Sequence, residues 1–362
     1  MKKIAIITLY GNNNFGNKLQ NYATQVILEK MGYEVTTIRN KITFKNKKEN
    51  LIFITKNIIK FLLNIKYFKK NKNREIMFNE FNENINYSTD IININNVPRY
   101  LNNQFDYFIY GSDQVWSPYA GGGSDLYLGI FSERKKNISF AASFGVYNIK
   151  ENYKKNYLKG LKNFKAISVR EDVGKTIVKE IADIDCEVLI DPTMLLQASD
   201  WEKLIKKPKN LTFKKYILNY FLGEIPENDS NEIKRIANKY NCEIINILNP
   251  NDKFYTSGPA EFLYLVKNAF LVCTDSFHAS VFALLFDVSF LVFERGKIKD
   301  SMNSRIDTLL SKFQLDNRKY VNGNITENNL NHDYSNAYKI LLNERKKSEL
   351  FLRKNLGTRE RQ

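Results

Sequence analysis

Apolar and polar positions alternate along the first forty residues in the order strand, loop, helix and strand. Residues 4–10 are an apolar run that predicts a buried strand, and the polar loop 11–17 follows it. Across 19–31, apolar residues recur near the 3.6-residue helical period, and Gly32 ends this stretch. A second apolar run at 34–38 predicts the next strand. This βαβ order predicts a parallel sheet.

The same pattern continues in two series. Further strands are predicted at 105–110, 137–142, 166–169 and 186–190, and each ends in polar or charged residues. The segment 197–212 is interpreted as a linker. A second series of predicted strands then follows at 216–220, 243–248, 269–273 and 289–293. The carboxyl ends of parallel strands meet at one edge of a sheet, so the polar strand ends should line such edges.

The predicted fold class is therefore α/β, with more than one domain in 362 residues. We expect α/β domains at 1–196 and 213–330. A last helix within 335–362 is expected to pack back on the first domain.

Charge changes this picture at one segment. The chain has a net charge of +16, which favours polyanions, anionic lipid or phosphorylated substrates as partners. Residues 41–75 form a basic apolar insert with eleven Lys or Arg and two acids. Lysines interrupt its apolar stretch 51–70, which therefore predicts a helix lying on an anionic membrane surface, not one spanning the bilayer. A surface helix docked on the domain is the alternative.

Cysteines and histidines are few. The three cysteines and two histidines show no metal-ligand spacing and no disulfide framework, so we expect core thiols in a reducing compartment and no structural zinc site. No metal-ligating residue and no cofactor is assigned. The first apolar run is too short for a signal peptide, and asparagines stand where a cleavage site would need small residues. We expect a cytoplasmic protein, with membrane association on the cytoplasmic face as a further hypothesis.

His278 is the strongest candidate for chemistry. It follows Asp275 by three residues, where the predicted strand at 269–273 gives way to a helical pattern. Ligands of open α/β sheets bind at such strand ends, and helix N-terminal amides favour anions. Asp275 is expected to cap the helix or to hold the imidazole through its second nitrogen. A core histidine with satisfied hydrogen bonds is the alternative.

Two loops offer further candidates. The loop 11–17 can bring backbone amides to a phosphate, or it is a plain turn capped by asparagine. Asp113, just past the strand 105–110, can accept a sugar hydroxyl proton, and Trp116 can give a sugar ring a flat apolar face. An aspartate turn beside a core tryptophan is the alternative.

Three arginines could supply positive charge for a carboxylate or a phosphate. They are Arg170, which follows a predicted strand, Arg295, which follows another, and Arg305, at the start of a predicted helix. An internal ion pair between Arg170 and Glu171 is the alternative for the first of them.

Eight segments in this order resemble the polysaccharide pyruvyl transferase family. They are 11–17, 19–23, 110–116, 139–145, 168–171, 191–193, 274–278 and 303–306. The resemblance implies a GT-B-like architecture, in which two Rossmann-like domains face each other across a cleft, the first binding the acceptor and the second the donor. It implies transfer of pyruvate from phosphoenolpyruvate to a sugar, usually as a ketal on two hydroxyls.

Roles for the candidate residues follow from the resemblance. His278 is expected beside the donor phosphate as an acid or an electrostatic clamp, and Asp113 at the acceptor hydroxyl. The remaining assignments are Arg170, Ser276, Arg295 and Arg305 for the donor, and Asn14, Gly16, Asn17, Ser112 and Trp116 for the acceptor. The acceptor is expected to be a lipid-linked or nucleotide-linked saccharide.

One departure from the family keeps other functions open. Family members often carry Arg-Leu-His where this chain has Ser276-Phe277-His278, so another arginine would have to hold the donor. The alternatives are a glycosyltransferase that uses a nucleotide sugar and a catalytically inactive, partner-binding homologue. Binding to nucleic acid is suggested only by charge, since the chain has no recognisable nucleic-acid-binding module.

Overall fold

The computed structural model describes residues 1–362 except for 12, 42–66, 296–303, 322 and 358–362. The chain divides into two compact units, each built around a parallel sheet. Unit 1 consists of Met1–Lys69, Asn82–Leu195 and Glu344–Gln362, and unit 2 of Lys70–Phe81 and Leu196–Asn343. The predicted α/β class is confirmed.

The sheet of unit 1 has five parallel strands in the order β3-β2-β1-β4-β5. The strands are β1 Lys3–Ile7, β2 Glu34–Lys41, β3 Tyr87–Asn93, β4 Tyr107–Tyr110 and β5 Asn137–Ser139. The strand order reverses between β1 and β4, which makes the loops after these two strands the topological switch point. Single bridges connect this sheet to a second, two-stranded one, made of β6 Ser168–Val169 and β7 Glu187–Val188.

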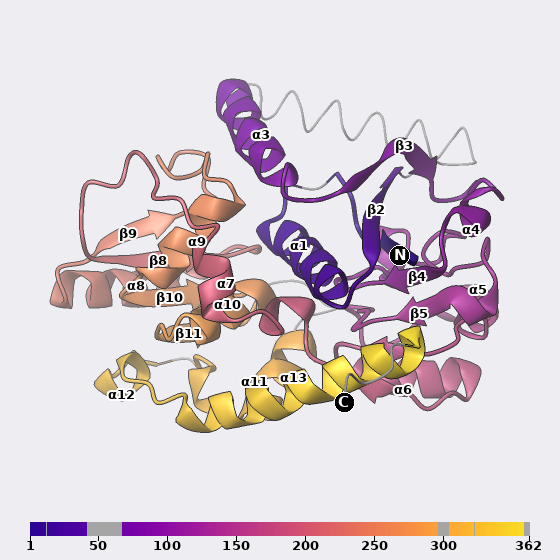
Figure 1. Cartoon of the computed structure of the whole chain (residues 1–362). Coiled ribbons are helices and arrows are strands. Elements are labelled where there is room, and N and C mark those ends of the chain that lie inside the picture. The colour runs from indigo at the N-terminus through magenta and orange to yellow at the C-terminus, as the bar shows by residue number, and fades with distance from the viewer. Residues whose placement is uncertain (12, 42–66, 296–303, 322, 358–362) are drawn as a thin grey trace. The chain divides into compact units, whose positions relative to one another are not determined.

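Helices cover the sheet of unit 1 because alternate strand residues point to opposite faces. Ala5 and Ile7 of β1 belong to one apolar core, and Ile4 and Ile6 belong to another. Helix α1 passes beside β2 (Figure 1). The helices of this unit are α1 Phe15–Lys30, α4 Leu101–Gln104, α5 Glu151–Leu161 and α6 Asp172–Ala182.

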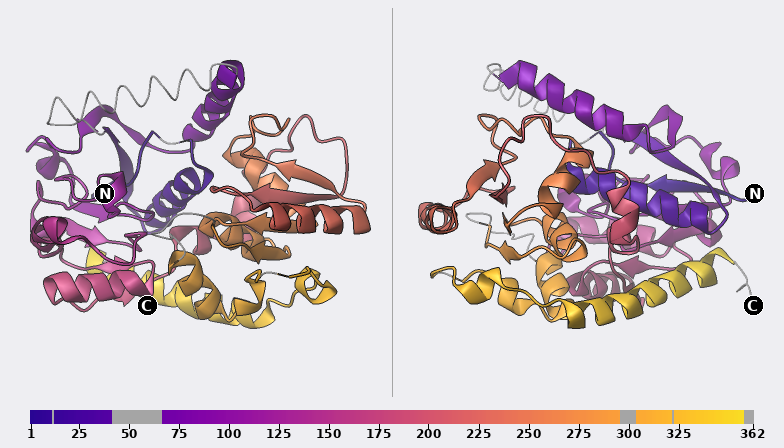
Figure 2. Two further views of the ribbon diagram at one scale, coloured as in Figure 1. Left: turned by 180° about the vertical axis from the view of Figure 1, so that it is seen from behind. Right: turned by 60° about the vertical axis from the view of Figure 1, so that its left-hand side comes forward.

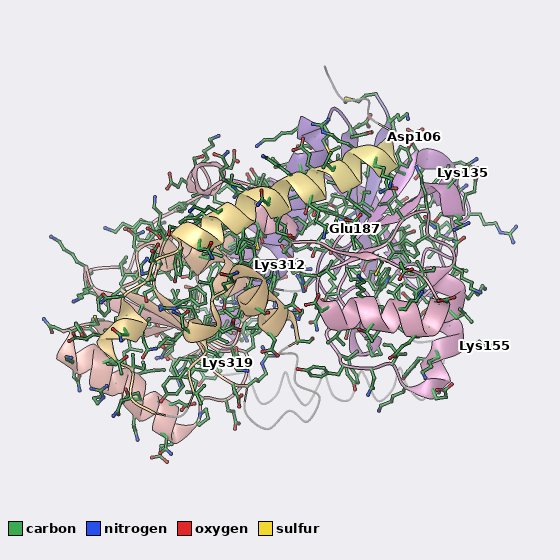
Figure 3. The ribbon with its side chains drawn as sticks, turned by 90° about the horizontal axis from the view of Figure 1, so that it is seen from below. Asp106, Lys135, Lys155, Glu187, Lys312 and Lys319 are labelled. Atoms are coloured by element: carbon green, nitrogen blue, oxygen red, sulfur yellow. The ribbon has the colours of Figure 1, made fainter. Side chains whose placement is uncertain are left out.

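The C-terminal helix α13, Ser335–Leu356, is continuous (Figure 2), and its end belongs to unit 1. Leu352 and Leu356 pack in the core that holds Ile4 and Ile6. Nζ of Lys347 lies 4.0 Å from Oε2 of Glu187, which is labelled beside α13 in Figure 3.

Unit 2 holds a four-stranded parallel sheet in the order β11-β10-β8-β9. The strands are β8 Tyr216–Tyr220, β9 Glu243–Asn246, β10 Leu271–Thr274 and β11 Phe290–Val292. The order reverses between β8 and β10, so the loops after these strands form the switch point of this sheet. The helices are α3 Phe68–Asn82, α7 Ala198–Glu202, α8 Glu227–Lys239, α9 Pro259–Lys267, α10 Phe277–Leu285, α11 Ser304–Phe313 and α12 Glu327–Leu330.

Two sequence interpretations need correction. The interpretation of 197–212 as a linker is wrong, because α7 lies within it and Trp201 is fully buried against Phe282. The edge strand β3 was not predicted, because its mostly exposed or half-buried residues give no apolar run.

The predicted lipid-binding segment 51–70 lies largely outside the described residues. Its described end begins α3, which is anchored to unit 2 where Nη1 of Arg74 donates to the carbonyl of Tyr255 at 2.6 Å. Within the described ranges, no helix is long and apolar enough to cross a membrane. Cys186 and Cys273 are buried, and burial raises the pKa of the Cys186 thiol to about 12.

Candidate active site

The first group of predicted site residues lies in unit 1, at the switch-point loop after β4. Gly111 has φ +110°, and a Cβ there would lie 2.6 Å from the carbonyl oxygen of Phe140, so only glycine fits. The peptide bond between Gly111 and Ser112 is cis, and Asp113 adopts a left-handed φ of 67° that aspartate tolerates better than most residues. The Asp113 carboxylate lies close to the Arg170 guanidinium.

Arg170, directly after β6, is the centre of this group. Its Nη1 donates to Oδ2 of Asp191 at 2.6 Å, and its Nη2 lies 3.4 Å from Oδ1 of Asp113. Burial on its own lowers the pKa of the Arg170 guanidinium, but the Asp191 and Asp113 carboxylates outweigh it, so the pKa is raised overall. Arg170 is thus held as a cation by two carboxylates of its own chain.

Asp191 also belongs to this group, although the sequence indicated it only within the segment 191–193 of the family resemblance. Its Oδ2 also accepts from the Ser112 hydroxyl at 2.9 Å, and its Oδ1 accepts from the backbone and hydroxyl of Thr193. The position of Asp191 after a predicted strand was the signal that could have placed it with Arg170. Glu171 instead binds the backbone amides of Phe144 and Gly145 through Oε1.

Two acceptor assignments in this group are wrong. Trp116 is fully buried, packs against Phe144 and Phe164, and donates its indole N–H to the carbonyl of Tyr127. Its ring therefore cannot stack on a sugar. Ser112 is also fully buried, with its hydroxyl engaged by Ala141 and Asp191. Packing therefore explains both residues. For Trp116 this agrees with the alternative of an aspartate turn beside a core tryptophan.

The other switch-point loop of unit 1 precedes α1. Asn14 is the N-cap of this helix, and its Oδ1 accepts from the amide of Asn17 at 3.1 Å. Gly16 and Asn17 are buried in the first turn. The asparagine-capped turn is therefore present, and the same turn leaves other N-terminal amides directed along the helix axis.

The second group lies in unit 2, at the switch-point turn between β10 and α10. Ser276 is the N-cap residue of α10, so the assignment of that position to Asp275 is wrong. The amide of Ser276 donates to Oγ1 of Thr274, and the Thr274 hydroxyl donates to the carbonyl of Tyr220. These bonds fix the turn from which α10 begins.

Asp275 binds the loop after β8 to this turn. It accepts from the amides of Leu222 at 2.7 Å and Gly223 at 2.9 Å, and from Nε of Arg295 at 2.9 Å. Nη2 of Arg295 donates to the Asp275 carbonyl, and both side chains are at most 4% exposed. A Cβ at Gly223 would lie 2.9 Å from Cγ of Arg295, so a glycine permits this close approach. Asp275 thus positions a loop and an arginine.

His278 lies in the first turn of α10, edge-on to the ring of Phe277. The residue is 7% exposed. Arg305 lies at the start of α11 and is likewise buried. The structure therefore brings Asp275, Ser276 and Arg295 together at the turn that carries His278. Among the residues that the structure describes, no cluster of His, Cys, Asp or Glu could hold a metal ion.

Comparison of the whole chain with solved structures shows the same architecture. A protein from Listeria monocytogenes that bears the name UDP-N-acetylglucosamine 2-epimerase superimposes with a TM-score of 0.53 at 12% identity, covering 97% of this chain and 91% of that one. The UDP-GlcNAc 2-epimerase of Methanocaldococcus jannaschii gives 0.49 at 13% identity, with 94% and 99% covered. The first of these superpositions, together with the two parallel sheets, shows a fold of the GT-B-like class with two Rossmann-like units.

The family is shown by a second comparison. The family model described as polysaccharide pyruvyl transferase matches residues 14–296, most of the chain. The protein belongs to this family and is a transferase. A search of curated proteins finds no match.

Proposed function

We propose that this protein transfers pyruvate from phosphoenolpyruvate to hydroxyls of a surface-polysaccharide sugar. The observation that carries the proposal is the turn at the start of α10, where His278 follows a strand end braced by Asp275 and Arg295. Membership of the family supports the reaction class. A helix N-terminus at a switch point suits an anionic donor, since its amides and dipole both favour negative charge.

The chemistry requires two proton movements. Two sugar hydroxyl oxygens bond to C2 of phosphoenolpyruvate, the C2–O bond to phosphate breaks, and phosphate departs. The two sugar hydroxyls release two protons. One balances the proton that C3 gains to become a methyl group, and the other leaves with phosphate. A histidine can deliver a proton to the donor or neutralise the departing phosphate, which is the role we assign to His278. Asp113 is assigned to the acceptor hydroxyl.

The remaining donor residues are assigned by charge. Arg295 and Arg305 would provide the guanidinium groups that a carboxylate and a phosphate need, in a chain that has Ser276 where family members often have arginine. Asp275 would act through Arg295, which it orients. Arg170, engaged by two carboxylates, would keep Asp113 in place and would not contact the donor.

The acceptor is proposed to be a lipid-linked or nucleotide-linked saccharide, with no cofactor required. A cytoplasmic protein that meets anionic membrane through residues 51–70 would fit a lipid-linked acceptor. Co-sedimentation with vesicles that contain anionic lipid, compared with neutral vesicles, tests this part; equal binding to both would refute it.

The central experiment compares donors. Phosphoenolpyruvate is expected to raise the thermal midpoint by mass action, and nucleotide sugars are expected to leave it unchanged. With a polysaccharide precursor present, release of inorganic phosphate from phosphoenolpyruvate should accompany formation of a pyruvyl ketal, observed as a new methyl resonance. Stabilisation by a nucleotide sugar alone would favour the glycosyltransferase alternative, and binding of phosphoenolpyruvate without turnover would favour an inactive homologue.

A further inference from the structure

Lys18 is a buried lysine at the start of α1, in unit 1. It is 3% exposed, and its Nζ lies 3.3 Å from the hydroxyl of Tyr87. The same Nζ is 5.4 Å from the ring centroids of both Tyr10 and Tyr87, which meet edge to face. The ammonium is therefore enclosed by two aromatic rings and one hydroxyl, which attract a cation but do not neutralise it.

Nothing in the described part of the chain balances this charge. No described carboxylate forms an ion pair with Lys18, and the first turn of α1 contains no acidic residue. The N-terminus of a helix carries positive partial charge, so a lysine in the first turn is disfavoured there. Burying an ammonium without a counter-charge costs further free energy, and desolvation accordingly lowers the pKa of Lys18 to about 8.

The same turn holds a second buried donor. Asn17 is 2% exposed, and its Nδ2 finds no acceptor among the described residues. Asn14 caps the helix by binding the backbone amide of Asn17, which leaves this side-chain amide unaffected. The buried ammonium of Lys18 and the buried side-chain amide of Asn17 therefore belong to adjacent residues at the N-terminus of a helix, where the partial charge is positive. Buried donors are almost always satisfied, so this turn favours a ligand that supplies oxygen atoms and negative charge.

The position of the turn indicates where that group would come from. It belongs to the loop after β1, at the switch point of the unit 1 sheet, where ligands of open α/β sheets bind. Phosphate is the anion that helix N-termini, lysine and amide donors commonly bind together.

We propose that the first turn of α1 is an anion subsite, in which Lys18 and Asn17 hold a phosphate group of the saccharide acceptor. Lipid-linked and nucleotide-linked saccharides share this phosphate chemistry. The identity of the ligand as the acceptor rests on the proposed function, whereas binding of a phosphate group at Lys18 does not.

Calorimetric titration of the full chain with inorganic pyrophosphate near pH 8, in two buffers of different ionisation enthalpy, tests the subsite. A bound anion raises the pKa of Lys18, so wild-type protein should take up more of a proton on binding than a variant without this amine, whatever proton pyrophosphate itself exchanges. Lys18→Met should weaken binding by about tenfold or more and lose this additional proton uptake. Lys165→Met is the matched control, because Lys165 also lies over a tyrosine ring, that of Tyr107, but is exposed; its affinity and uptake should equal those of wild type.

Two further variants keep the test decisive if Lys18→Met folds poorly. Lys18→Arg retains the charge, so it should bind pyrophosphate but lack the additional proton uptake of wild type, since arginine does not titrate in this range. Asn17→Ala should weaken binding and retain the uptake. Wild-type protein that binds no pyrophosphate, or Lys18 variants that keep both affinity and uptake, would show that Lys18 only fills space between the tyrosines.

Competition assigns the ligand. A nucleotide-diphosphate sugar and a short prenyl diphosphate are each titrated against bound pyrophosphate. The ligand that belongs to the acceptor class should displace pyrophosphate more strongly from wild-type protein than from Lys18→Met. Displacement by phosphoenolpyruvate through Lys18 would overturn the acceptor assignment. A chain that binds pyrophosphate through Lys18 but never consumes phosphoenolpyruvate would overturn pyruvyl transfer and leave the subsite standing.

Discussion

Nη1 of Arg170 lies 2.6 Å from Oδ2 of Asp191, and neither side chain is more than 1% exposed. Removing one partner of a buried pair leaves the other charge uncompensated, which costs about 3–5 kcal/mol. Arg170→Met should therefore lower the free energy of unfolding of unit 1 by roughly this amount, measured by urea titration with a probe that reports on that unit. Lys179→Met, which removes an exposed partner of Asp183, should leave the unfolding midpoint unchanged. A stable Arg170→Met protein that no longer binds phosphoenolpyruvate would instead make this arginine a donor ligand.

Trp116 gives a second test of packing against binding. Its indole is fully buried between aromatic neighbours, so Trp116→Ala should destabilise the protein by about 3–5 kcal/mol. Transfer activity per folded molecule should stay close to wild type, since the ring does not reach a sugar. Tyr119→Ala is the control, because Tyr119 is 66% exposed and its loss should not change stability. An intact thermal midpoint in Trp116→Ala with a raised KM for the acceptor would restore the sugar-binding role.

The two histidines of the chain provide an internal comparison. His278→Gln should lower kcat for phosphoenolpyruvate-dependent phosphate release by about a hundredfold or more, because a proton donor beside the departing phosphate is lost. His332, near Asp287 and outside the proposed site, serves as the control, and His332→Gln should retain full activity. The thermal midpoint of His278→Gln should change little. A lowered midpoint with unchanged kcat would make His278 a core residue.

The strand positions could be predicted because apolar runs in a parallel sheet are continuous. Residues 216–220 were predicted as a strand and form β8 with these bounds, and the predicted strand 34–38 lies within β2. Strand β3 escaped prediction because an edge strand with mostly exposed or half-buried side chains carries no apolar signal. The segment 197–212 was interpreted as a linker because it contains lysines and a proline. This was wrong, since the indole of Trp201 packs against Phe282.

Side-chain partners were harder to predict than strand ends. The sequence placed Arg170 and Asp191 after separate strands, but only the parallel pairing of β6 with β7 brings those strand ends together. Asp275 was recognised as part of the site, yet its real partners, Leu222 and Gly223, lie more than fifty residues earlier in the chain. Lys18 gave no signal at all, since a lysine in an amphipathic helix is normally solvated and burial is decided by tertiary packing.

The pH dependence of stability tests whether the Lys18 ammonium is desolvated. In the unfolded chain this amine keeps its proton up to about 10.5, whereas in the folded protein its pKa is about 8. Between these values the unfolded state binds more protons, so this residue makes stability rise with pH. At pH values below the folded pKa, Lys18 destabilises the protein by about 3 kcal/mol, which corresponds to the difference between the two pKa values.

The measurement is a difference between variants, because many tyrosines also begin to titrate at high pH. The free energy of unfolding of Lys18→Met minus that of wild type should be largest near neutral pH and should shrink as pH rises from about 8 towards about 10.5. Lys165→Met should track wild type across this range. Saturating pyrophosphate should flatten the difference, since a bound anion raises the pKa of Lys18 towards its unfolded value and removes the linkage. A difference that stays constant with pH would mean that the ammonium remains solvated, and the argument for an anion subsite at α1 would then lose its energetic basis.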